Sequence, residues 1–82
     1  MKIGVVHWRD AMTNRGQIQR YIAEAMNPMP MVTVGVLVKE DDNVIILAQD
    51  YIEDEDDGTV DFRAVSLIPK VNVTKIEILE SQ

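Results

Sequence analysis

The chain has 82 residues, and 46% of them are apolar, which is enough for one small hydrophobic core and too few for a multidomain enzyme. Its 14 aspartates and glutamates outnumber its 8 lysines and arginines, so the net charge is −6, the wrong sign for a protein that holds nucleic-acid backbone over its whole surface. We therefore expect a single soluble domain, residues 1–82, with no stable DNA binding.

Cysteine is absent, which excludes disulfides, thiolate nucleophiles and thiolate metal sites. The first ten residues contain no apolar run long enough for a signal peptide, and no stretch is apolar enough to span a membrane. We expect a cytoplasmic protein that is neither exported nor inserted into a membrane.

The first predicted strand covers residues 2–8, where apolar side chains alternate between two faces. From Asn14 the apolar period changes to three or four residues, which is typical of a helix. Asn14 is followed three residues later by a glutamine, a spacing that resembles a capping box, and Pro28 prevents the helix from continuing. The pattern predicts one helix, about residues 14–26. Its apolar stripe would consist of Ile18, Tyr21, Ile22, Ala25 and Met26.

Valine and isoleucine dominate the rest of the chain and favour strands. Residues 40–43 have the composition of a turn, and the acidic run 53–57 ends in Gly58, as expected of a solvated hairpin tip. Five short strands and one helix predict a mainly β fold with one helix, a small five-stranded antiparallel barrel of the Sm-like or SH3-like type. The four later strands are predicted over residues 31–39, 44–52, 60–68 and 76–80.

The sequence contains no recognisable catalytic or metal-binding motif. His7 is the only histidine, Ser66 has no adjacent base, and the four glycines are scattered, so triads, P-loops and dinucleotide fingerprints are absent. The acidic run 53–57 offers oxygen ligands for calcium, but the twelfth loop position would be Ala64, where a bidentate glutamate is required. We therefore predict no enzyme, no cofactor and no metal site. The run is interpreted as a solvated, self-repelling tip, with a weak cation site or a docking surface for a basic partner as alternatives.

The most promising ligand-binding residues lie near strand ends. The single tryptophan, Trp8, stands beside Arg9 and Asp10, a combination that can stack a base and hold its polar rim; the alternative is a tryptophan of the core or of an oligomer interface. Three further cations near strand ends can meet a phosphate, or are solvated surface charges. The candidate ligand-binding residues are Trp8, Arg9, Asp10, Lys39, Arg63 and Lys70.

Several pieces of the sequence have a familiar order and spacing: VHWRDA, TVGVLVKEDD, ILAQ and IPK, the last followed by IEIL. Together they resemble a family of small phage-encoded proteins with an Sm-like or SH3-like barrel. In this resemblance Trp8 and Asp10 correspond to the family's W-x-D motif, Lys39 to its LVKED motif and Lys70 to its IPK motif. The segment between the first two pieces is commonly a loop in the family, whereas this sequence predicts a helix there.

The resemblance implies a function without catalysis. Some phage proteins with this kind of barrel act as sponges, sequestering cyclic or ADP-ribose-type nucleotide signals made by host defence systems. We accordingly expect a non-enzymatic protein of the host cytoplasm that binds a nucleotide second messenger and inhibits anti-phage defence. The alternatives are a protein-interaction module that docks on a host or phage protein, and Sm-like RNA binding. The small core and the open sheet edges also predict a homo-oligomer.

Overall fold

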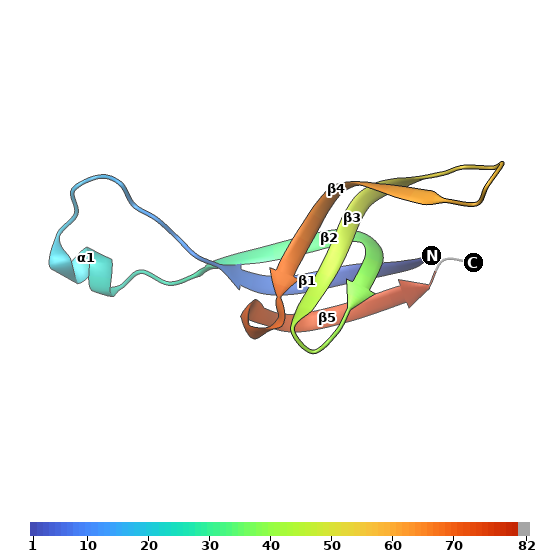
Figure 1. The fold of residues 1–82 in the computed structure, drawn as a ribbon. Helices are drawn as coiled ribbons and strands as arrows, with labels where there is room; N and C mark the ends of the chain where they lie inside the picture. The colour runs from blue at the N-terminus through green and yellow to red at the C-terminus, as the bar shows by residue number, and fades with distance from the viewer. Residues whose placement is uncertain (81–82) are drawn as a thin grey trace.

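The computed structural model describes residues 1–80 and contains a single five-stranded sheet with one short α-helix and one 3₁₀ turn (Figure 1). Neighbouring strands are antiparallel, in the order β4-β3-β2-β1-β5, which confirms the predicted mainly β fold with five strands. The outer strands β4 and β5 do not pair, so the sheet is open within residues 1–80 and barrel closure stays a prediction. The elements are β1 (Lys2–Asp10), α1 (Arg20–Glu24), β2 (Met29–Glu40), β3 (Val44–Glu53), β4 (Val60–Pro69), η1 (Lys70–Asn72) and β5 (Val73–Glu80).

The sheet divides into two ribbons that are joined only where the last part of β2 pairs with the first part of β3. The first part of β2 pairs with β1, and β2 begins to pair with β3 only at Val36, opposite Ala48. Beyond Ala48, β3 pairs with β4 alone. The ribbons cross where Gly35 lies against β3, and a Cβ at this position would stand only 2.6 Å from the Ala48 carbonyl oxygen. Glycine therefore permits the close approach of the two backbones.

The hydrophobic core lies at this crossing and is small. Its fully buried large side chains are Val6, Ile45, Leu47 and Ile68. Trp8 and three aliphatic side chains are partly buried against this cluster. No polar side chain is buried among residues 1–80, so the crossing is held by apolar contact and by the strand ladders.

Two segments project beyond the core. We call residues 9–31 the β1–β2 arm and residues 49–63 the acidic hairpin. They extend to opposite ends of a molecule with principal extents of 59 × 23 × 20 Å (Figure 1). The radius of gyration is 16.8 Å, whereas a compact domain of this length has about 12 Å. No helix among the described residues is long and apolar enough to cross a membrane.

The predicted helix over residues 14–26 is wrong in extent, because α1 covers only Arg20–Glu24. Asn14 does not cap a helix; its Oδ1 accepts a hydrogen bond from the backbone N–H of Gly16 at 2.8 Å, which forms a local turn. Most of the predicted apolar stripe is also uncovered, since Tyr21, Ile22 and Met26 are exposed and only Ile18, which lies outside α1, is partly buried. Most helical stability in proteins comes from packing an apolar face, so without a partner the helix shrinks to little more than one turn.

Candidate ligand-binding site

Trp8 belongs to the core rather than to an exposed platform. The indole is half-buried and packs against the core cluster that includes Leu47. Its Nε1 donates a hydrogen bond to Thr33 Oγ1 at 2.9 Å. These contacts agree with the core alternative for the tryptophan, because the ring already packs inside the fold.

Lys39 and Lys70 are each paired with a carboxylate near the turn between β2 and β3. Lys39 Nζ lies 3.3 Å from Asp41 Oδ2, and Lys70 Nζ donates a hydrogen bond of 2.7 Å to Glu40 Oε2. The backbone N–H of Lys70 also donates to the Asn43 carbonyl at 2.8 Å, which holds η1 beside the turn. Each lysine thus has a carboxylate partner, so neither is a free cation for a phosphate.

Asp41 organises the same turn. Its Oδ1 accepts hydrogen bonds from the backbone N–H groups of Asn43 at 2.8 Å and Val44 at 2.9 Å. The hydrogen bond from Val44, then that from Asn43, and then the neighbouring Lys39 lower the pKa of the Asp41 carboxyl below its usual value. The carboxylate thus has a structural role in the turn.

Arg63 is also paired. Its Nε and Nη2 donate to the two carboxylate oxygens of Asp50, both at 2.8 Å, across the β3–β4 ladder. This bidentate contact lowers the pKa of the Asp50 carboxyl and raises that of the Arg63 guanidinium. Arg63 and Lys70 are seven residues apart along β4 and its end, roughly 23 Å of extended chain, so the two cations do not converge on one site.

Arg9 is the one candidate cation that makes no ion pair with any residue among 1–80. β1 continues past its last pair with β5, Trp8 opposite Val73, and this extension places Arg9 beside η1. Asp10 is turned to its own backbone, where Oδ1 accepts a hydrogen bond from the Ala11 N–H at 2.8 Å. Arg9 borders an open groove of about 370 Å³ whose other lining residues are Ala11, Pro28, Val71, Asn72, Val73 and Thr74.

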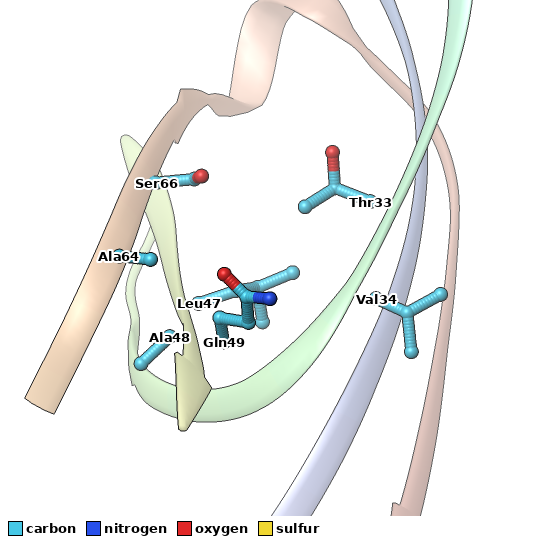
Figure 2. Close-up of a pocket in the computed structure, with 7 residues that line it drawn as sticks. All are labelled: Thr33, Val34, Leu47, Ala48, Gln49, Ala64 and Ser66. Atoms are coloured by element: carbon cyan, nitrogen blue, oxygen red, sulfur yellow. The ribbon is translucent and has the colours of Figure 1, made fainter. Parts of the chain in front are cut away.

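A second pocket, of about 320 Å³, opens where β2 and β3 diverge. Figure 2 shows Thr33 on the β2 side of this pocket, with Gln49 and Ser66 on the β3–β4 side. Its lining contains no charged side chain, and its floor includes the buried Leu47 and Ala48. The pocket can hydrogen-bond a neutral polar group, and it offers nothing to balance a phosphate.

The sequence does not single out the groove's polar side chains, Asn72 and Thr74, or the pair Thr33 and Gln49. Each stands alone in the sequence, and only the strand crossing and η1 bring them to a concave surface. The available signals were the Pro69 that ends β4 and the Gly35 at the crossing. Among the described residues, no group of three or more histidines, aspartates or glutamates is placed to hold a metal ion.

The residues thus give two candidate sites, a groove with one free guanidinium and a neutral pocket. In comparisons with protein-family models, curated proteins and solved structures, nothing matches this chain. A function must therefore be inferred from the chain's own chemistry.

Proposed function

We propose that this chain is a non-enzymatic binding protein that holds a small phosphorylated ligand of the nucleotide type in the groove beside Arg9. The observation that carries the proposal is the unpaired guanidinium of Arg9, in contrast to Lys39, Arg63 and Lys70, which each have a carboxylate partner. A guanidinium presents a planar fork of donors that matches phosphate oxygens, and it keeps its charge at any physiological pH.

The rest of the groove suits a nucleotide. Asn72 and Thr74 supply neutral hydrogen-bonding groups, while Pro28 and Val71 supply apolar surface on which a base can pack. Val71 is 92% exposed, so this surface is available to a ligand. The biological role that we propose is sequestration of a nucleotide immune signal in the host cytoplasm, as the family resemblance implies. It requires tight binding and no chemistry.

Thermal shift and titration of the fluorescence of Trp8, the only tryptophan, test the proposal. The probes are ADP-ribose, a panel of cyclic dinucleotides and inorganic phosphate. A ligand that binds only the folded chain raises its melting temperature with the logarithm of concentration. Arg9→Ala should weaken binding by roughly tenfold or more, since a charge-assisted hydrogen bond contributes about 1.5–3 kcal/mol.

Two matched variants sharpen the result. Arg9→Lys keeps the charge without the bidentate fork and should fall between the wild type and Arg9→Ala. Arg63→Ala removes a guanidinium that is already paired with Asp50, and it should leave the ligand affinity unchanged. If no probe at millimolar concentration moves the melting curve, or if Arg63→Ala weakens binding as much as Arg9→Ala, the proposal is wrong. The protein-interaction module then becomes the better explanation.

A further inference from the structure

The chain exposes more surface than a compact monomer of its mass. Its accessible surface is 6453 Å², against about 5,000 Å² expected for a compact 9.3 kDa protein. A stable protein–protein interface takes about 800 Å² from each partner. The excess of roughly 1,450 Å² is therefore large enough for such an interface.

Much of the exposed apolar surface lies on the two projecting segments. On the β1–β2 arm, Tyr21 and Ile22 are 68% and 44% exposed, and on the acidic hairpin Tyr51 and Ile52 are 38% and 55% exposed. Large side chains of this kind are the ones that a protein interface buries at its centre. The arm adds three exposed methionines, Met12, Met26 and Met29.

The two segments also carry opposite charge. The arm has three arginines against Asp10 and Glu24, a net charge of +1, whereas the hairpin has seven carboxylates against Arg63, a net charge of −6. Arg15 and Arg20 make no ion pair among residues 1–80. Nor do the carboxylates of Glu53, Glu55 and Asp56 at the other end.

Each projecting segment has a strand edge without a partner. β2 pairs with β3 only from Val36 onward, so the outer edge of its first part is open. β3 pairs with β2 only as far as Ala48, so its edge in the acidic hairpin is open too. Open edges present unpaired N–H and C=O groups to any neighbouring chain.

We propose that two copies of this chain associate antiparallel and side by side, each with its β1–β2 arm against the acidic hairpin of the other. The two segments lie at opposite ends of the long axis (Figure 1), so a two-fold axis across the middle brings each arm to the partner's hairpin. The same contact is made twice, the assembly closes at two chains, and the free arginines meet the free carboxylates. The charged contact is assigned to Arg15 and Arg20, whereas the groove is bordered by Arg9 at the base of the same arm.

Charge reversal tests the pairing directly. The arm variant is Arg15→Glu with Arg20→Glu, and the hairpin variant is Glu55→Lys with Asp56→Lys. Asp54 and Asp57 are left in place because they accept hydrogen bonds within the hairpin turn. Light scattering after size exclusion should give twice the 9.3 kDa chain mass for the wild type. Each variant alone should have its dissociation constant raised at least roughly tenfold, because like charges then face each other.

Restoration is the decisive measurement. An equimolar mixture of the arm and hairpin variants should form a 1:1 dimer, and a single chain with all four substitutions should dimerise again. The matched control, Lys2→Glu with Lys75→Glu, changes the net charge as the arm variant does, but on β1 and β5, and should remain dimeric. Circular dichroism checks that every variant is folded.

Any of the following results would overturn the proposal. The first is a wild type of one chain mass at tens of micromolar, which leaves these surfaces to a different protein. The second is a folded four-substitution chain that stays monomeric. The third is a control that dissociates as fully as the arm variant, or an assembly larger than two chains, either of which points to other edges of the sheet. Because none of these measurements uses a ligand or alters Arg9, their failure is separable from failure of the proposed binding function.

Discussion

The ribbon crossing contains apolar residues similar to those of the two projecting segments, but the residues at the crossing are buried and those of the segments are exposed. At the crossing, Ile45 and Leu47 are 0% and 1% exposed, whereas in the arm and hairpin Ile22 and Ile52 are 44% and 55% exposed. Local pattern alone does not separate them, because alternating or helix-spaced apolar residues occur in both. The difference is whether another part of the chain arrives to cover them. The crossing therefore sets the fold, and the projecting segments are free to bind.

The largest effect on stability should come from a cavity in the hydrophobic core at the crossing. Leu47→Ala removes a fully buried side chain from a core of four large residues, and the free energy of unfolding should fall by about 2–5 kcal/mol. Ile22→Ala in the arm should change it by less than about 0.5 kcal/mol, as for most surface substitutions. Urea denaturation followed by Trp8 fluorescence measures both.

These two variants are compared in the Arg15→Glu, Arg20→Glu background, where the arm no longer docks on a second chain and association does not add to stability. Equal losses for Leu47→Ala and Ile22→Ala would mean that the arm folds onto the core in solution. The distinction between crossing and projecting segments would then be wrong.

Two glycines at the crossing should differ in how much an added methyl group destabilises the fold. A Cβ at Gly35 would stand 2.6 Å from the Ala48 carbonyl oxygen, a backbone atom that cannot move without parting the ribbons. At Gly4 it would stand 2.8 Å from Leu47 Cδ2, the end of a flexible side chain. Gly35→Ala should therefore cost about 1–3 kcal/mol of stability, and Gly4→Ala clearly less. If thermal melts rank them the other way, the ribbons are not held by close backbone contact at Gly35.

The strands could be predicted from the sequence because alternation and turn residues are local signals, and four of the five both begin and end within two residues of the prediction. The predicted helix over residues 14–26 is too long. Its sequence pattern indicates an apolar face, but it does not indicate whether another part of the chain covers that face. Burial is a property of the whole fold, so the extent of α1 could not be derived from its own residues.

The candidate site was predictable only as a set of residue types. Lys70 pairs with Glu40, thirty residues away in the sequence, and Arg63 pairs with Asp50 across the β3–β4 ladder. Neither ion pair can be predicted from neighbouring residues in the sequence. Trp8 could be interpreted as a stacking platform or as core, and only its packing and its bond to Thr33 favour the core. Arg9 differs from the other candidate cations because no carboxylate among residues 1–80 pairs with it. No sequence pattern reveals this absence of a partner.

Acidification should distinguish the turn at the crossing from the turn of the acidic hairpin. Asp41 in the first and Asp57 in the second both have a lowered pKa, chiefly from backbone N–H donors, Val44 for Asp41 and Thr59 for Asp57. A lowered folded-state pKa gives stability that is present above the unfolded value, near 3.8, and is lost as the pH falls through the folded value. The Asp41 turn leads directly into the buried Ile45, whereas the Asp57 turn lies at the far end of a hairpin with no buried side chain, so the Asp41 turn should dominate acid unfolding.

The measurement is the melting temperature between pH 7 and pH 2.5. Asp41→Asn keeps an acceptor oxygen without the titration and should flatten the acid decline, while Asp57→Asn should follow the wild-type curve. Because both groups are exposed, the difference should be a few degrees at most. A decline that Asp57→Asn flattens more than Asp41→Asn would show that the hairpin tip, rather than the crossing, controls acid unfolding.

The smallest effect should come from shortening the acidic tip. Replacing residues 54–57 by Asn-Gly removes four carboxylates and leaves a four-residue turn, Asn-Gly followed by Gly58 and Thr59, between the paired Glu53 and Val60. The tip loses the hydrogen bonds that Asp54 and Asp57 accept from the backbone, and it gains relief from like-charge repulsion. No side chain between residues 49 and 63 is buried, so the change should not affect packing at the crossing. The melting temperature, measured in the Arg15→Glu, Arg20→Glu background, should move by no more than a degree or two. A large loss, or a melting temperature of the parent chain that rises with calcium, would instead reveal an ordered cation site in the tip and would place this hairpin with the structural part of the molecule.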